Sequence, residues 1–154
     1  MRTSPLVISL LSLALVAPAV GVALAQQPPA PPGSQVLLDF EYFRTNVQPI
    51  FVAKREGHAR CVACHTTASN MRLQKLAADS TTWSESDSRK NFDAVRRMVV
   101  PGNLRSRLLM HPLATDAGGD FFHNGGKHFA SQDDREWLIL KAWVMGNTTA
   151  ASGR

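Results

Sequence analysis

The stretch CVACH, residues 61–65, contains both cysteines of the 154-residue chain and places a histidine directly after the second one. A close pair of cysteines is used in three kinds of site: a disulfide or redox dithiol, a metal centre, and a covalently attached haem. Each kind requires different surroundings in the sequence. The choice among them therefore sets which fold the remaining residues are expected to form.

The surroundings of the two cysteines argue against the first two kinds of site. A redox-active dithiol opens a helix in a βαβ unit, and no strand pattern surrounds Cys61 and Cys64. A disulfide between them would close a very short loop and add little stability. A structural zinc ion requires four ligands, and the adjacent Cys64 and His65 would be strained as two ligands of one tetrahedral ion.

The same spacing suits a covalent haem, for which Cys-x-x-Cys-His is the attachment pattern. Residues i and i+3 of a helix project from one side, so Cys61 and Cys64 can each form a thioether to one of the two vinyl groups of a haem. His65, the next residue, can direct its imidazole at the iron as the proximal ligand. The sequence therefore predicts one covalent haem c, with its iron, held by Cys61, Cys64 and His65.

The N-terminal segment predicts export from the cytoplasm. A basic start is followed by the apolar run LVISLLSLALV, residues 6–16, and by the small-residue pattern of a signal peptidase site at 23–25. These are the three parts of a secretory signal peptide, which we expect to span residues 1–25. A periplasmic or otherwise extracytoplasmic location agrees with covalent haem attachment. Membrane association is expected only if residues 6–25 stay uncleaved, because they are long enough to span a bilayer.

Composition divides the rest of the chain. The segment QQPPAPPGSQ, residues 26–35, is rich in proline and predicts an extended linker. Residues 36–147 suffice for one domain with a modest core, and residues 148–154 are expected to form a tail.

The chain has 17 Lys and Arg against 12 Asp and Glu, a net charge of +5. Because these basic residues are scattered, they argue against nucleic-acid binding and are compatible with an acidic partner protein.

Between the linker and the tail, apolar residues recur at helical spacing and there is little strand pattern. We therefore expect an all-α domain of a few helices. They are predicted at 39–46 with a turn after Pro49, at 61–65, from a Ser86 or Asp87 cap to Val99, at 104–110 after Asn103, and from a Ser131 cap to Gly146. A loop with two pairs of glycines, residues 113–130, precedes the last helix, and its length suggests a function.

Five segments carry a family resemblance: VQPIF (47–51), RCVACH (60–65), VPGNLRSRLL (100–109), HNGGKHF (123–129) and EWLILKAWVMG (136–146). Together they resemble the bacterial planctomycete cytochrome C-like group of small single-haem domains. The resemblance implies a small c-type cytochrome fold, in which few helices and a long glycine-rich distal loop surround one covalent haem. We expect the first and last helices to pack over the haem with a core of Phe40, Phe43, Val47, Phe51, Trp137 and Trp143.

The second axial ligand of the iron is open between several side chains. The glycine-rich loop contains His123 and His128, and glycines let a backbone approach a flat cofactor closely. The resemblance implies His123, because HNGG matches a His-x-Gly-Gly ligand loop of histidine-ligated relatives; His128 is the second choice. His111 or Met110, at the end of the preceding helix, comes next. The commonest members have Met-Pro-Pro in this loop, and no Met-Pro occurs here, which favours a histidine.

These expectations describe an electron carrier rather than an enzyme. With a His/His-ligated iron it would exchange single electrons with redox partner proteins, acidic ones among them. Two alternatives remain open at this point. An iron with a free distal position would serve a haem sensor or a peroxidase-like enzyme, and the chain could be the haem subunit of a larger redox complex.

Overall fold

The computed structural model describes residues 36–67 and 69–148, which all belong to one compact unit of the chain. Within these residues every regular element is helical, and the one β-bridge, between Leu113 and Phe129, is isolated. The all-α class expected from the sequence is therefore confirmed. No described helix is long and apolar enough to cross a membrane. The predicted signal peptide, the predicted linker and residues 149–154 lie outside the described residues.

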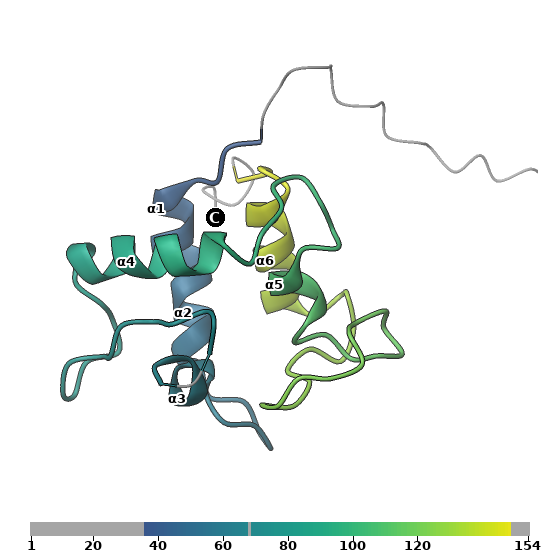
Figure 1. Cartoon of the computed structure of the whole chain (residues 1–154), viewed down its shortest axis with the longest axis horizontal. Helices are drawn as coiled ribbons and strands as arrows, with labels where there is room; N and C mark the ends of the chain where they lie inside the picture. The colour runs from purple at the N-terminus through teal and green to yellow at the C-terminus, as the bar shows by residue number, and fades with distance from the viewer. Residues whose placement is uncertain (1–35, 68, 149–154) are drawn as a thin grey trace, which may run out of the picture. The chain divides into compact units, whose positions relative to one another are not determined.

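Seven helical segments follow one another in the described chain. They are α1 (Phe40–Tyr42), the π-helical segment η1 (Phe43–Val47), α2 (Gln48–Val52), α3 (Cys61–His65), α4 (Glu85–Arg96), α5 (Arg107–Met110) and α6 (Arg135–Val144). In Figure 1, α1, η1 and α2 form one column, with α4 crossing its upper part and α3 at its lower end. α6 and α5 stand together beside this column.

The column is one continuous helix, whereas the sequence predicted a helix and a separate turn. Asp39 caps it, because its side chain accepts the Tyr42 N–H at 2.9 Å. Pro49 lies in the first turn of α2, where it has no N–H to donate and its ring crowds the carbonyl one turn back. The wider π turn immediately before it, in which the Gln48 N–H bonds to the Phe43 carbonyl, accommodates the proline without ending the helix.

The start and the end of α4 also differ from the prediction. Ser84 caps the helix in place of Ser86 or Asp87. The Ser84 hydroxyl accepts the Asp87 N–H at 3.1 Å, so Asp87 lies inside the first turn. The helix ends at Arg96 rather than Val99. There the Val99 N–H bonds three residues back to the Arg96 carbonyl at 3.1 Å, which is a tighter turn than an α-helix makes.

The two later helices begin after their predicted positions. The Asn103 side chain accepts the Arg105 N–H at 2.8 Å and closes a turn, so α5 starts only after Ser106. Ser131 does not cap α6, because Asp134 does so by accepting the N–H groups of the second and third residues after it. A carboxylate is favoured at this position because its charge also interacts favourably with the N-terminus of the helix.

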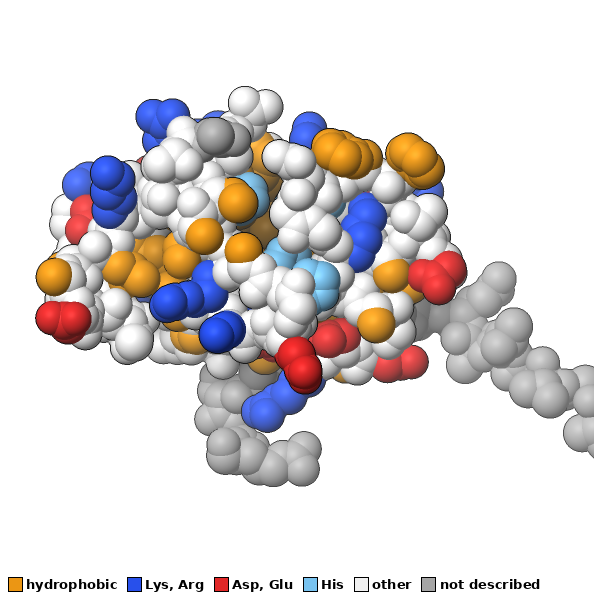
Figure 2. Space-filling view, turned by 90° about the horizontal axis from the view of Figure 1, so that it is seen from below, with side chains coloured by type: hydrophobic (Ala, Val, Ile, Leu, Met, Phe, Trp, Pro, Cys, Tyr) orange, Lys and Arg blue, Asp and Glu red, His pale blue; other side chains and the backbone are white. Residues whose placement is uncertain are grey.

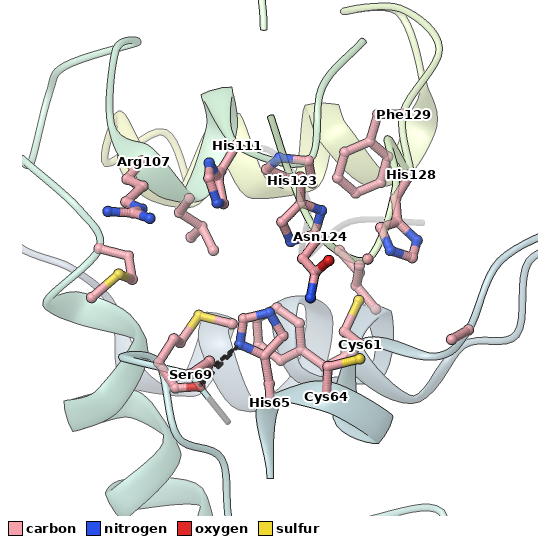
Figure 3. Close-up of a pocket in the computed structure, with 18 of the residues that line it drawn as sticks. Cys61, Cys64, His65, Ser69, Arg107, His111, His123, Asn124, His128 and Phe129 are labelled. Carbon is pink, nitrogen blue, oxygen red and sulfur yellow. Dashed lines mark hydrogen bonds between the residues drawn. The ribbon is translucent and has the colours of Figure 1, made fainter. Parts of the chain in front are cut away.

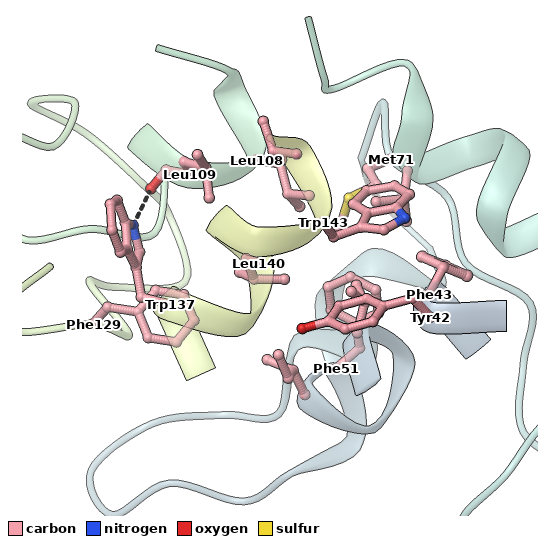
Figure 4. Packing of buried hydrophobic residues seen from close by; sticks show 14 of the residues in the cluster. Tyr42, Phe43, Phe51, Met71, Leu108, Leu109, Phe129, Trp137, Leu140 and Trp143 are labelled. Carbon is pink, nitrogen blue, oxygen red and sulfur yellow. Dashed lines mark hydrogen bonds between the residues drawn. The ribbon is translucent and has the colours of Figure 1, made fainter. Parts of the chain in front are cut away.

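The core lies where α6 packs against η1. Trp143 is fully buried, its ring centroid is 5.2 Å from that of Phe43, and its indole N–H donates to the Asp39 carbonyl at 2.8 Å. Towards α5, the Trp137 indole N–H donates to the Leu109 carbonyl at 3.1 Å (Figure 4). α6 is thereby joined both to the first helical column and to α5.

Most of the predicted core is buried. The confirmed residues are Phe43, Val47, Phe51, Trp137 and Trp143. Phe40 is a correction, because it is only partly buried and packs edge-to-face on Phe92, with ring centroids 5.6 Å apart. The guanidinium of Arg89 lies over its ring, 4.3 Å from the centroid. The first residue of the column is therefore at the rim of the core rather than inside it.

A buried polar network joins α4 to α2 and to the chain after α3. The Asn91 amide donates to Gln48 Oε1 at 3.1 Å, and its oxygen accepts the Gln74 N–H at 2.7 Å. Gln48 in turn donates to the Ser88 hydroxyl at 2.9 Å. Each bond avoids the cost of burying an unpaired polar group. This network could not be predicted from the sequence, because polar residues at helical spacing look like an exposed face.

Replacing Trp143 by alanine should lower the free energy of unfolding by about 3–5 kcal/mol, because a buried ring and its hydrogen bond are both lost. Chemical denaturation followed by circular dichroism measures the change. Leu138→Ala on the same helix is the matched control. Leu138 is 43% exposed, so its truncation should lower the free energy of unfolding by less than about 1 kcal/mol. Equal losses in the two variants would contradict the packing described here.

Candidate functional site

A cavity of about 420 Å³ lies between α3 on one side and α5 with the following loop on the other. Its volume falls in the range of small-molecule and cofactor pockets, roughly 300–1,000 Å³. Figure 2 shows histidine side chains in a hollow of this face. The site residues predicted from the sequence line this cavity with the exception of Met110: Cys61, Cys64, His65, His111, His123 and His128.

The wall formed by α3 carries the two cysteines. The helix predicted at 61–65 is present, and the extended backbone of Arg60 leads into it. Both thiols are free, Cys61 partly buried and Cys64 exposed, and Figure 3 shows their sulfur atoms close together at one end of the cavity. Burial raises the pKa of the Cys61 thiol, so this group is protonated at neutral pH.

Two hydrogen bonds hold the ring of His65. Its Nδ1 lies 3.0 Å from the Met71 carbonyl oxygen and 2.8 Å from Ser69 Oγ. The Ser69 hydroxyl donates its own hydrogen to the Met71 carbonyl at 2.7 Å, so the imidazole has to supply the hydrogen at Nδ1. A neutral ring with its hydrogen on Nδ1 has a lone pair on Nε2. His65 is therefore held in the form that a metal ligand requires.

His123 is held in the same way from the opposite wall. Its Nδ1 lies 2.6 Å from the Gly126 carbonyl oxygen. A carbonyl only accepts, so Nδ1 carries the hydrogen and Nε2 has the lone pair. The turn that brings this carbonyl to the ring requires glycine, because Gly126 has a φ of +82° and a Cβ there would lie 3.4 Å from His58 Nδ1.

The rings of His65 and His123 face each other across the cavity (Figure 3). Their centroids are 6.3 Å apart and their planes differ by 27°. Two imidazoles bound on opposite sides of one metal ion would have centroids about 6.4 Å apart, given metal–nitrogen bonds of about 2.0 Å and about 1.2 Å from nitrogen to centroid. The donor set and its spacing therefore fit a metal ion between the two rings, with the thiols of α3 beside it.

All five histidines of the chain lie in or next to this cavity. The ring centroids of His111 and His128 are 4.8 Å and 5.8 Å from that of His123, and His58 is 4.9 Å from His128. His128 is 8% exposed, and its Nδ1 is buried without a hydrogen-bond partner among the described residues. The distal side of the cavity is thus a cluster of imidazoles.

Burial favours the uncharged form of three of these imidazoles, those of His65, His123 and His128. It lowers the pKa of His65 and of His123, and it lowers the pKa of His128 to about 4, where repulsion by His58 and Arg55 adds to the effect. A neutral imidazole is the form that binds metals. In the part of the chain that the structure describes, no group of three or more His, Cys, Asp or Glu side chains could hold a metal ion.

Several contributors to the site had no signal in the sequence. In the sequence Ser69 is indistinguishable from an ordinary loop serine, yet its hydroxyl oxygen lies 2.8 Å from His65 Nδ1. The bond from His123 to the Gly126 carbonyl could not be predicted, because every residue has a backbone carbonyl. The double glycine did indicate a special backbone conformation. Met71 and Met98 line the cavity, whereas Met110 was the methionine named as a possible ligand from the sequence.

Comparisons with known proteins leave the family open: no family model, no curated protein and no solved structure matches this chain. The resemblance to the planctomycete cytochrome C-like group therefore stays a prediction, and so does the small c-type cytochrome fold that it implies.

The free energy of unfolding should fall as the pH is lowered from about 6.5 towards 4. The pKa of His128 is about 4 in the folded chain and 6.5 ordinarily, so in this window the unfolded chain binds a proton that the folded chain does not. The contribution is fully present above pH 6.5 and is lost below 4, amounting to at most about 3–4 kcal/mol. Urea unfolding at a series of pH values measures it.

The variant His128→Gln should reduce this pH dependence, because the substituted side chain does not titrate. The depressed pKa values of His65 and His123 act in the same direction and leave a residual slope. A slope equal to that of the unsubstituted protein would show that His128 does not resist protonation in the fold.

Proposed function

We propose that this protein is an electron carrier in which Cys61 and Cys64 bind one haem c covalently and His65 and His123 are its axial ligands. The observation that carries the proposal is the pair of facing imidazoles, 6.3 Å apart, beside two free thiols in the same cavity. A bound haem supplies an iron that cycles between Fe(III) and Fe(II), one electron at a time. The corresponding fold is the small c-type cytochrome fold.

The chain's own part in this function is to keep the two imidazoles fixed. Ser69 and the Met71 carbonyl hold one ring, and the Gly126 carbonyl holds the other. Both rings are thereby kept with Nε2 available and with one orientation. Ligands that are already in place need little reorganisation when the charge at the site changes, which favours electron transfer.

The cavity has a buried side and an exposed side, which suits exchange of electrons with another protein. Phe51 and Phe129 line it and are almost fully buried, whereas Cys64 and Phe122 line it and are exposed. Arg60 and Arg107 also line it and are exposed. Electrons would leave through this exposed edge, and the positive charges there favour an acidic redox partner. The N-terminal segment supports a periplasmic or otherwise extracytoplasmic location.

An open-site sensor or peroxidase-like enzyme is the less favoured function, because the ring of His123 faces that of His65 across the cavity. A haem subunit of a larger complex is compatible with the same chemistry. Phe121 and Phe122, next to the cavity, are 91% and 64% exposed, and exposed aromatic side chains of this kind are common at protein interfaces. Sedimentation of the native protein with its membrane fraction would separate a subunit from a free carrier.

Protein produced with a cytochrome c maturation system should gain the mass of one haem per chain, since both thiols are consumed by thioethers. Intact-protein mass spectrometry measures this. Cys61→Ala and Cys64→Ala should each retain a single thioether and shift the pyridine haemochrome band. An unmodified mass with two titratable thiols under the same conditions would overturn the proposal.

The ferric protein should be low-spin with nitrogen on both sides of the iron. Electron paramagnetic resonance and near-infrared spectra distinguish this ligation from histidine with methionine. The reduction potential should lie below that of His/Met cytochromes, because a thioether ligand raises the potential. A sulfur-to-iron band at the red end of the ferric spectrum would instead assign the distal position to Met71 or Met98, which both line the cavity.

A further inference from the structure

A second imidazole lies beside His123 on the distal side of the cavity. The ring centroids of His111 and His123 are 4.8 Å apart and the planes are at 65°. Both rings line the cavity, and Figure 3 shows both on the side opposite His65. Two histidines therefore stand next to one ligand position, of which the proposed function uses only one.

His111 has the same tautomer as the two proposed ligands. Its Nδ1 lies 3.1 Å from Asp120 Oδ2, and a carboxylate oxygen accepts, so the ring hydrogen is on Nδ1 and Nε2 of the neutral ring has the lone pair. Metal-binding histidines often donate a hydrogen bond to a carboxylate from the ring nitrogen that does not bind the metal. This bond makes the imidazole a stronger donor to the metal.

The backbone around His111 is held firmly. His111 follows α5 directly, and its N–H bonds to the Arg107 carbonyl at 3.0 Å. Its own carbonyl accepts the Lys127 ammonium at 3.0 Å. Asp120 is fixed from the other side, because its N–H donates to the Met110 carbonyl at 2.9 Å and its carbonyl accepts Lys127. The His111–Asp120 pair is thus part of one cross-linked unit.

His123 lies on a different kind of backbone. It is on the glycine-rich loop, next to Gly125 and Gly126, and its ring, like that of His111, has one hydrogen bond among the described residues, to the Gly126 carbonyl. Its own carbonyl accepts the Gly126 N–H at 2.9 Å. Glycines leave a backbone more freedom than other residues do. Of the two distal imidazoles, the one that faces His65 is therefore on the segment whose glycines allow more backbone conformations.

We propose that His111 is a reserve distal ligand, whose Nε2 binds the haem iron when His123 leaves it. The inference rests on the proposed function. Rotation about the two side-chain torsions moves the His111 ring while its backbone stays at the end of α5. The exchange breaks one nitrogen–iron bond and forms another, so no electron or proton is gained or lost. The iron keeps two histidine ligands throughout and stays closed to small molecules.

His128 is the other histidine near the position, but it is less suitable. Its ring centroid is farther from that of His123, at 5.8 Å, and its side chain is packed beside His58 in a buried place. No hydrogen bond orients its Nδ1 among the described residues. We therefore treat ligation by His128 as a competing outcome of the test.

Four variants of the haem-loaded protein test the proposal: His123→Ala, His111→Ala, and the double variants H111A/H123A and H123A/H128A. The measurements are the ferric spin state by electron paramagnetic resonance and the rate at which the reduced protein binds carbon monoxide. His123→Ala should stay low-spin. If His111 occupies the site about 90% of the time, carbon monoxide should bind about tenfold more slowly than in H111A/H123A. His111→Ala should stay low-spin through His123.

H123A/H128A is the matched control and should behave like His123→Ala. The proposal is overturned if His123→Ala is high-spin and binds carbon monoxide as fast as H111A/H123A. It is also overturned if H123A/H128A opens the iron and H111A/H123A does not, which would assign the reserve role to His128. Added imidazole should restore the low-spin spectrum of H111A/H123A, which checks that the cavity is intact.

If H111A/H123A does not retain haem, one further double variant tests the proposal by comparison with His123→Ala. Asp120→Asn combined with His123→Ala removes the carboxylate partner of His111 and should speed carbon monoxide binding relative to His123→Ala alone. An unchanged rate would overturn the proposal. Absence of covalent haem in the unsubstituted protein is a separate result, visible in its mass before any spectrum is taken, and would overturn the proposed function instead.

Discussion

The contact between Trp143 and Phe43 is the interaction on which the candidate site depends, although neither side chain lines the cavity. One wall of the cavity, α3, follows the helical column that contains Phe43. The other wall, α5 with the distal loop, precedes the helix that contains Trp143. Ring contact at 5.2 Å and the bond from the Trp143 indole to the Asp39 carbonyl join these two parts of the chain. Without this packing the histidines of the two walls would have no fixed separation.

Two backbone carbonyls orient the imidazole rings of His65 and His123. The carbonyls of Met71 and Gly126 each accept from an imidazole Nδ1 and so leave Nε2 for a metal. Backbone groups are suited to this task because helices and turns fix their positions, and because a carbonyl imposes one tautomer on the ring. Burial acts in the same direction, since it lowers the pKa of both imidazoles and keeps them neutral.

The wall opposite α3 combines a helix end with a glycine-rich loop. His111 is joined to a helix end, a carboxylate and a lysine, whereas His123 is on a turn that exists only because Gly126 adopts a positive φ. A rigid scaffold with a more mobile ligand loop is a common division of roles in binding sites. In this protein both parts carry an imidazole, which is why we propose that His111 can replace His123 as a ligand.

The sequence by itself determined the features that depend on neighbouring residues. The helix at 61–65, the all-α class and five of the six predicted core side chains follow from spacing along the chain, because helical periodicity fixes which side chains share a face. Helix starts were less certain, since Ser84 and Asp134 competed with nearby caps that are equally suitable in sequence. Haem and its attachment remain predictions from the CVACH spacing, and the family remains a prediction from five segments of the sequence.

Only the tertiary structure decided which distal histidine faces His65. The family resemblance placed His123 first, but His111, His123 and His128 are all possible ligands in sequence, and the structure distinguishes them by where it places their rings. The path of the loop depends on the bridge between Leu113 and Phe129, on the turn at Gly126 and on the packing of α6, which involve residues far apart in the chain. Local spacing constrains directions within one helix. The distance of 6.3 Å between two rings on different segments arises only when the segments pack together.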